Sequence, residues 1–244
     1  MKVLGIIPSR YGSSRFPGKP LIDLKGKSMI QRVYEQTKKC DAFTTVVVAT
    51  DDERIYDHVT AFGGEVMMTS DQHQSGTERC GEVIEKWTDF DIVVNIQGDE
   101  PLIRPEQLSD LIAVFEDESV EIATLVKAMH NEADIRNPNR IKVVLDDLKN
   151  GIYFSRSPIP HIANTPHDEW MDKTTFWKHI GIYAWQMSVL KTLLTFEPCP
   201  LERLESLEQL RWLFNGYKIR TVETFIETPN IDAPEDIDAV LKLL

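Results

Sequence analysis

The chain has 244 residues, of which 42% are hydrophobic and 27% are charged, and its 39 acidic against 27 basic side chains give a formal net charge of -12. This composition is typical of a soluble globular protein and excludes the collagen-like, disordered and membrane-spanning classes. A chain of this length buries roughly 70% of its unfolded surface, so it needs no disulfide or metal ion to fold. The excess of acids argues against a protein whose whole surface binds nucleic acid, because such binding depends on Lys and Arg.

The cysteines and the apolar segments bear on where the protein is found. Cys40, Cys80 and Cys199 are odd in number and far apart, which favours reduced thiols in a reducing compartment. No CxxC or HxxxH spacing offers a zinc site. The first apolar run, residues 3–7, is too short for a signal peptide, and no window approaches the ~20 apolar residues of a transmembrane helix. We therefore expect a cytoplasmic protein without membrane insertion and without a nucleic-acid partner.

Strand and helix patterns alternate along the first half of the chain. Apolar, β-branched runs predict strands at residues 3–7, 45–50, 66–68 and 91–97. Amphipathic stretches predict helices at 28–39, 53–62, 77–87 and 105–116. Ser28 and Gln31 have capping-box spacing, and Gly63-Gly64 ends the second helix. This alternation predicts βαβ crossovers and a doubly wound α/β fold with a parallel sheet between helices.

The pattern changes after residue 120. We expect strands at 122–128, 141–145, 179–185 and 218–222, helices at 204–214 and 234–244, and a long loop at 155–176, which is rich in Pro, His and Asn. No internal repeat or linker-like composition divides the chain. We therefore expect one domain with an inserted strand-rich arm that serves dimer contact.

The loop after the first strand is strongly basic. Residues 9–20 carry Arg10, Arg15 and Lys19 and no acid, although the protein is acidic overall. In doubly wound folds ligands bind beyond the carboxyl ends of strands, and Gly12 and Gly18 let backbone N–H groups approach an anion. The loop therefore predicts a polyphosphate site, with a solvated basic loop as the alternative.

Two common nucleotide motifs are excluded by spacing. The P-loop requires G-x-x-x-x-G-K-[ST], whereas five residues separate Gly12 from Gly18 here and Lys19 is followed by Pro20. The dinucleotide fingerprint G-x-G-x-x-G is also absent. The phosphate loop, if it is one, belongs to another class.

Acidic residues follow the fourth predicted strand and precede the last helix. Asp99, in the segment 97–101, suits a Mg²⁺ ligand beside a polyphosphate, and a turn residue is the alternative. Asp232 joins it only if the fold brings the two together, whereas helix capping accounts for Glu235 and Asp236. Residues 75–79 begin a helix. They bind either phosphate or a base edge, or Ser75 or Thr77 serves only as the N-cap of that helix.

Six segments resemble, in the same order, those of the 3-deoxy-manno-octulosonate cytidylyltransferase (CMP-Kdo synthetase) family. They are residues 8–21 (PSRYGSSRFPGKPL), 75–79 (SGTER), 97–101 (QGDEP), 153–158 (YFSRSP), 179–183 (HIGIY) and 204–211 (LESLEQLR). The resemblance runs from about residue 3 to residue 238. Phe16, Glu78 and Ala233 stand where the family more often has Leu, Asp and Thr.

The resemblance implies a fold and a reaction. The fold would be Rossmann-like, of the nucleotide-diphospho-sugar transferase type: a mixed, mostly parallel sheet with helices on both faces and a small dimerisation arm. Residues 1–244 would form a single domain, with nucleotide binding at about 1–118 and sugar-acid binding and dimer contact at about 119–225. CTP and 3-deoxy-D-manno-octulosonate (Kdo) would give CMP-Kdo and pyrophosphate with Mg²⁺, in a homodimer, for lipopolysaccharide biosynthesis.

The resemblance also implies residue roles. Arg10, Lys19 and Asp99 would act in catalysis, and Asp99 and Asp232 would bind the metal. The residues implied for CTP are Arg10, Ser13, Arg15, Lys19, Ser75 and Arg79. Those implied for Kdo are Gln97, Arg156, His179, Tyr183, Glu208 and Gln209, with Arg156 as a partner of the sugar-acid carboxylate.

The residue types favour direct transfer, because there is no G-x-S-x-G elbow and no cysteine with an activating neighbour. His179 and Tyr183 share one face of a strand, and a structural or positioning role suits His179 better than that of a general base. Glu205, Glu208 and Arg211 have the spacing of helical ion pairs, so whether Glu205 or Glu208 contacts the sugar stays open. A cytidylyltransferase for 8-amino-Kdo or a sialic acid, and a non-catalytic nucleotide-binding protein, are the alternative functions.

Overall fold

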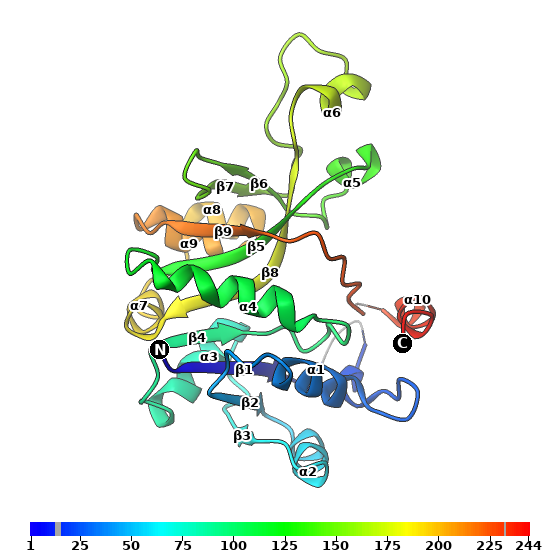
Figure 1. Cartoon of the computed structure of the whole chain (residues 1–244), viewed down its shortest axis with the longest axis vertical. Coiled ribbons are helices and arrows are strands. Elements are labelled where there is room, and N and C mark those ends of the chain that lie inside the picture. Colours follow the sequence, from blue (N-terminus) through cyan, green and yellow to red (C-terminus); the bar gives the residue numbers. More distant parts are fainter. Residues whose placement is uncertain (13–15, 232) are drawn as a thin grey trace. The chain divides into compact units, whose positions relative to one another are not determined.

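The computed structural model describes residues 1–12, 16–231 and 233–244 (Figure 1). Contacts within the chain form two compact units. The first unit comprises Met1–Ile112, Ala184–Leu194 and Ile226–Leu244. The second unit comprises Ala113–Tyr183 and Thr195–Phe225.

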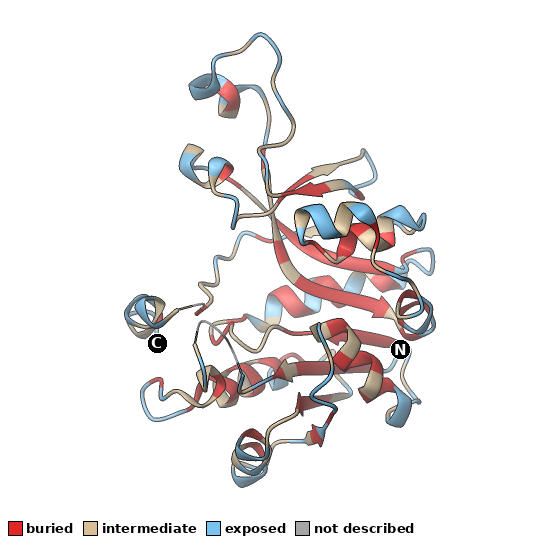
Figure 2. Cartoon of the chain, turned by 180° about the vertical axis from the view of Figure 1, so that it is seen from behind, coloured by how far each residue is buried: buried red, intermediate tan, exposed pale blue. Residues whose placement is uncertain are grey.

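The first unit contains parallel strands in the order β3-β2-β1-β4. They are β1 (Val3–Ser9), β2 (Thr45–Thr50), β3 (Val66–Met68) and β4 (Ile92–Asn95). The apolar runs of β1, β2 and β4 are buried along nearly their whole length (Figure 2), as expected for strands covered on both faces. Because β2 and β4 flank β1 on opposite sides, the strand order reverses between β1 and β4, where doubly wound folds bind ligands.

The helices of this unit begin where the sequence predicts. They are α1 (Met29–Lys38), α2 (Glu53–Ala61), α3 (Gly76–Lys86) and α4 (Pro105–Ala113). The 3₁₀ turn η2 (Val114–Glu116), which continues α4, belongs to the second unit. The side chains of Ser28, Asp52 and Ser75 cap the first three by accepting backbone N–H groups. The chain leaves α2 through Gly63, whose φ of +79° favours glycine.

The remaining elements of the first unit are short. They are the 3₁₀ turns η1 (Lys19–Leu21) and η4 (Pro234–Asp236) and the helices α7 (Met187–Leu193) and α10 (Ile237–Leu241). The predicted closing helix over 234–244 thus begins as a 3₁₀ turn and is shorter than expected. Leu24, Met29, Ile231 and Val240 are buried together, so apolar packing holds the C-terminal segment against the residues that follow the first loop.

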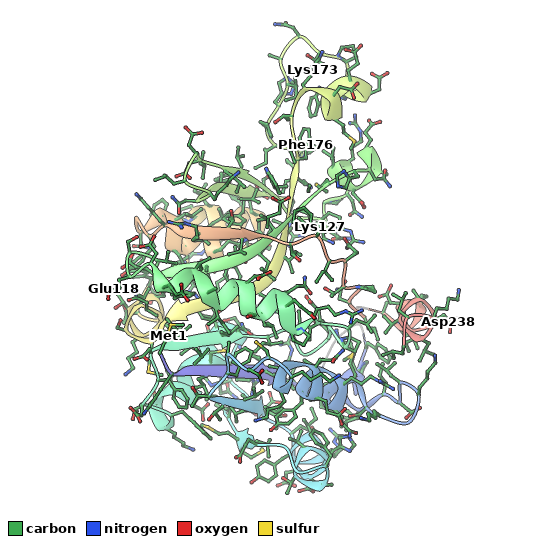
Figure 3. The ribbon with its side chains drawn as sticks, viewed as in Figure 1. Met1, Glu118, Lys127, Lys173, Phe176 and Asp238 are labelled. Atoms are coloured by element: carbon green, nitrogen blue, oxygen red, sulfur yellow. The ribbon has the colours of Figure 1, made fainter. Side chains whose placement is uncertain are left out.

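The second unit contains a mixed group of strands. β5 (Ile122–Ala128) lies between β8 (Trp177–Gln186) and β9 (Ile219–Glu223) and is parallel to β9. Residues 184–186 of β8 belong to the first unit. β6 (Lys142–Leu145) pairs antiparallel with β7 (Gly151–Ser155) and β8. Lys127, labelled in Figure 3, lies near the end of β5. Its Nζ donates to the Phe225 carbonyl at 2.7 Å. The predicted mixed, mostly parallel α/β fold is confirmed.

One predicted helix is wrong. Residues 204–214 form two short helices, α8 (Pro200–Glu205) and α9 (Gln209–Phe214), rather than one. Ser206 between them has φ +51°, a left-handed conformation that ends α8, and the Leu207 N–H bonds back to the Glu202 carbonyl. The helical spacing of the side chains continues across this break, so periodicity could not reveal it.

The predicted loop over 155–176 is partly wrong. It contains the 3₁₀ turn η3 (His167–Glu169) and the helix α6 (Trp170–Lys173). The Trp170 and Phe176 rings stack with their centroids 6.0 Å apart (Phe176 is labelled in Figure 3). They belong to an apolar cluster with Met129 and Ile135, and this local core explains why a polar segment is ordered. Sequence patterns also missed β7, α5 (Glu132–Arg136) and α7, which are too short for a clear period.

Among the described residues, no helix combines the length and apolar character needed to cross a membrane.

Candidate functional site

A pocket of about 250 Å³ lies at the carboxyl ends of β1 and β4 in the first unit. It is lined by Pro8, Ser9 and Arg10 at the end of β1, by Lys19, Pro20 and Met29, by His73, Gln74, Ser75, Gly76 and Arg79 at the start of α3, and by Gln97, Gly98 and Asp99 after β4. The pocket therefore occupies the switch point of the sheet, and it gathers three of the segments singled out in the sequence.

Lys19 and Asp99 form the central ion pair of the pocket. The Lys19 Nζ lies 2.7 Å from Asp99 Oδ2, and the two side chains are only 14% and 26% exposed. The Lys19 Nζ also donates to the Ile231 carbonyl at 2.8 Å, and the Ile231 N–H donates to the Asp99 carbonyl at 3.1 Å. Lys19 thus joins the segment after β4 to the C-terminal segment. Asp232, the predicted second metal ligand, lies outside the described residues.

Two glycines allow close backbone approaches beside this pair. A Cβ at Gly98 would lie 2.8 Å from the Pro8 carbonyl oxygen, so only glycine lets the turn before Asp99 approach the end of β1 so closely. Gly18 has φ +74°, and its N–H donates to the Tyr11 carbonyl at 3.0 Å, which closes the basic loop just before Lys19. Ser13 and Arg15, both predicted to hold triphosphate, lie outside the described residues.

Two further polar side chains line the pocket, one exposed and one buried. Arg10 is exposed and lines the pocket, as expected of a group that receives an anion from solvent. Ser9 is buried, lines the pocket, and its hydroxyl has no hydrogen-bond partner within residues 1–12, 16–231 and 233–244. A buried polar group of this kind is favourable only when it acquires a partner, which a ligand can supply.

Arg79 lines the pocket but its guanidinium is engaged elsewhere. It donates to Asp51 Oδ2 at 2.7 Å, to the Ser70 carbonyl at 3.2 Å and to the Thr69 hydroxyl, and its side chain is 4% exposed. These contacts tie α3 to the ends of β2 and β3. Ser75 lines the pocket and caps α3 by accepting the Glu78 N–H at 3.2 Å, so the N-cap interpretation is confirmed.

The predicted Kdo residues divide between the units. Gln97 lines the pocket of the first unit, whereas Arg156, His179, Tyr183, Glu208 and Gln209 belong to the second unit. Within the second unit, His179 and Tyr183 lie close, with ring centroids 5.3 Å apart, and the His179 Nε2 is 3.0 Å from the Thr124 hydroxyl. The strand parity that placed both rings on one face of β8 is thus consistent with their contact.

Burial controls the protonation of these rings. It lowers the pKa of His179 to about 3, so the imidazole is neutral near pH 7. Burial, together with the Glu208 charge, raises the pKa of Tyr183 well above its usual value, so its hydroxyl stays protonated. Gln209 is buried, and its side-chain nitrogen has no hydrogen-bond partner in the described part of the chain. Neutral donors and acceptors of this kind suit the hydroxyls of a sugar.

Arg156 is held by backbone carbonyls. Its guanidinium donates to the carbonyls of Glu205 at 2.6 Å, Pro138 at 3.1 Å and Ser206 at 3.3 Å. The Glu205 carboxylate in turn accepts the Arg156 N–H at 2.9 Å and the Ser155 hydroxyl at 2.7 Å. Glu205 therefore anchors the end of β7, and of the two glutamates it is Glu208 that lies near Tyr183.

Three further polar residues have no signal in the sequence. His73 lines the pocket and its Nε2 lies 2.6 Å from the Glu82 carboxylate. Asp51 is the partner of Arg79. Lys142 is fully buried at the start of β6. Each is defined by a contact between segments far apart in sequence or by burial, so residue spacing alone could not reveal it.

Comparison with known proteins shows the family of this chain. A family model described as Cytidylyltransferase matches residues 4–219. The 3-deoxy-manno-octulosonate cytidylyltransferase of Parabacteroides distasonis is 53% identical over 100% of this chain and 98% of its own length, and that of Bacteroides thetaiotaomicron is 52% identical over 97% and 96%. A solved CMP:2-keto-3-deoxy-manno-octonic acid synthetase complexed with CTP is 42% identical, with a TM-score of 0.94 over 100% of this chain and 98% of that one.

A more distant structure shows how widely the fold is shared. A Bacillus anthracis protein described as a putative glucose-1-phosphate thymidylyltransferase has a TM-score of 0.68 at 18% identity, over 99% of this chain and 94% of that one, which shows the fold alone. The identities near 50% to the two cytidylyltransferases are far higher than this 18%, and they extend over both units. This chain belongs to the 3-deoxy-manno-octulosonate cytidylyltransferase family of nucleotidyltransferases.

Proposed function

We propose that this protein transfers CMP from CTP to the anomeric hydroxyl of Kdo and releases pyrophosphate. The observation that carries the proposal is the pocket at the switch point, where Lys19 of the basic loop meets Asp99. A solved relative described as complexed with CTP is similar over the whole chain, which supports CTP as the nucleotide.

The first unit supplies the nucleotide site. Arg10 and Lys19 bring positive charge to the pocket of an acidic protein, and Ser9 offers an unpartnered hydroxyl within the described residues. We assign the triphosphate to Arg10, Ser13, Arg15 and Lys19, and the cytosine side to the start of α3 at Ser75. Because its guanidinium is tied to Asp51, Arg79 contributes by holding that edge of the pocket in place.

Magnesium fits the donors present. Mg²⁺ is commonly bound by one or two carboxylates together with substrate phosphates and water, rather than by a complete protein cage. Asp99 offers one such carboxylate in the pocket, and the described residues contain no cluster of three or more His, Cys, Asp or Glu that would make a closed cage. We propose that Asp99 and Asp232 hold the ion, which when bound neutralises phosphate charge.

The second unit supplies sugar-acid residues. We propose that His179, Tyr183, Glu208 and Gln209 bind Kdo hydroxyls, and that Arg156 serves its carboxylate. His179 is neutral at its low pKa and its Nε2 faces the Thr124 hydroxyl, so it positions the sugar rather than taking up a proton.

The reaction itself is a direct displacement. The anomeric oxygen forms a bond to the α-phosphorus, the bond from that phosphorus to the bridging oxygen of pyrophosphate breaks, and the hydroxyl proton passes to solvent. Such transfer depends on alignment and charge neutralisation rather than on a covalent enzyme intermediate. Arg10 and Lys19 supply the fixed positive charge. We further propose that the enzyme acts in the cytoplasm, within lipopolysaccharide biosynthesis, as a homodimer.

Pyrophosphate release tests the proposal. The protein is incubated with CTP and Mg²⁺, with and without Kdo, beside 8-amino-Kdo, sialic acid, and ATP, GTP or UTP in place of CTP. Release that requires both CTP and Kdo is expected. Release only with another sugar acid would keep the mechanism and replace the acceptor, whereas a folded protein that binds CTP without any release would be a non-catalytic nucleotide-binding protein.

A further inference from the structure

Lys142 is a fully buried lysine whose ammonium is surrounded by backbone oxygen. Its Nζ donates to the carbonyls of Asn137 at 3.0 Å, Arg140 at 2.7 Å and Arg156 at 2.5 Å. Lysine is almost never fully buried unless it is paired, because removing its charge from water is costly. Three carbonyl partners match the three donors of an ammonium group, so each of its hydrogen bonds is satisfied.

These carbonyls come from two separate segments of the second unit. Asn137 and Arg140 belong to the turn that precedes β6, and Arg156 follows β7 directly. Lys142 begins β6, which pairs with β7 on one side and β8 on the other. The ammonium thus occupies the place that a small monovalent cation would take among converging carbonyl oxygens, and joins the turn to the end of β7.

The contacts of Arg156 extend this connection. Its guanidinium binds Pro138 in the same turn, and it also binds the carbonyls of Glu205 and Ser206 at the end of α8. Ser206 has the left-handed backbone conformation that separates α8 from α9, and Glu208 and Gln209 follow it directly after Leu207. A continuous set of hydrogen bonds therefore leads from Lys142, through Arg156, to the bend that precedes the proposed sugar-acid residues.

We propose that Lys142 is a positioning residue that acts as a tethered monovalent cation, fixing Arg156 and, through it, the bend before Glu208 and Gln209. It touches neither substrate nor reacting atoms, and the inference rests on the proposed function of those residues. Loss of the ammonium removes one donor from each of three carbonyls, of which that of Asn137 keeps the Arg140 N–H, and frees the end of β7. The expected consequence is weaker binding of the sugar acid with unchanged binding of CTP, because the nucleotide pocket is built from the first unit.

Two variants separate a cation site from a merely structural lysine. Lys142→Ala removes the side chain and leaves room between the carbonyls, whereas Lys142→Met keeps most of the volume and fills that room. In both, the KM for Kdo should rise about tenfold or more while the KM for CTP stays within about twofold. Ammonium chloride or potassium chloride should restore the KM and the Tm of Lys142→Ala but not of Lys142→Met. Tetramethylammonium chloride, too large for the site, controls for ionic strength.

The outcomes are decisive. An unchanged KM for Kdo in a folded Lys142→Met, an equal rise in both KM values, or equal rescue by tetramethylammonium would overturn the positioning role. If the wild type shows no turnover with CTP and Kdo, the proposed function fails. The cation site is then still judged by the Tm of Lys142→Ala, since a Tm that ammonium does not raise above its value in tetramethylammonium contradicts it.

Discussion

Lys19 and Asp99 lie 80 positions apart in the chain, yet their charged groups are 2.7 Å apart in the pocket. Lys19 reaches the Ile231 carbonyl as well, so a single ammonium joins the basic loop, the turn after β4 and the C-terminal segment. The pair is mostly shielded from water, which strengthens the attraction between its two charges relative to an exposed pair.

Asp99→Asn should fold and lose most activity. The amide keeps the size of the carboxylate but removes the charge that pairs with Lys19 and the ligand proposed for Mg²⁺, so kcat should fall by about 100-fold. Pyrophosphate release at saturating CTP and Kdo measures this. Asp89→Asn, which removes an exposed carboxylate paired with Lys2, is the control and should leave kcat unchanged. Near wild-type turnover of Asp99→Asn would remove Asp99 from the mechanism.

Arg79→Met should destabilise the protein by about 3 kcal/mol, because it leaves the poorly exposed Asp51 carboxylate without its partner. Urea unfolding measures the change. Arg54→Met is the control, since the Arg54 side chain that pairs with Asp52 is 59% exposed, against 4% for Arg79, and its loss should cost less than about 1 kcal/mol. Equal costs for the two variants would contradict the structural role given to Arg79.

Arg156→Ala should act on stability and on sugar binding together. The guanidinium donates to three carbonyls, and their loss should cost about 1–3 kcal/mol in unfolding free energy. The KM for Kdo should rise while that for CTP does not. Arg136→Ala, which breaks an exposed pair with Glu132, should change neither. An unaltered KM for Kdo would show that the sugar-acid carboxylate is held elsewhere.

His179 should make the fold sensitive to acid. Its pKa is about 3 when folded and near 6.5 when unfolded, so between these values the unfolded state binds more protons. The neutral ring therefore contributes stability that is complete above about pH 6.5 and is lost as the pH falls. The wild type should lose about 2 kcal/mol relative to His179→Gln between pH 7 and pH 4.5. Parallel pH profiles for the two proteins would contradict this.

Several features followed from local chemistry. The apolar runs of β1 and β2 identified buried strands, and Ser28 identified a helix start, because burial on both faces and capping depend on residues adjacent in the chain. The absence of acids between residues 9 and 20 likewise identified the basic loop. Where a helix ended in a left-handed serine, at Ser206, no residue type announced it, since glycine or asparagine is the usual signal.

The sequence by itself determined the α/β class, the positions of the principal strands along the chain and the family, because these depend on periodicity and on ordered segments of the chain. Only the tertiary structure decided which charges meet. It paired Arg79 with Asp51, it placed the Arg156 guanidinium against backbone carbonyls, and it buried the Lys142 ammonium among three other carbonyls. The physical reason is that a hydrogen bond is fixed by distances of about 3 Å between groups that chain folding brings together, and residue spacing carries no record of those distances.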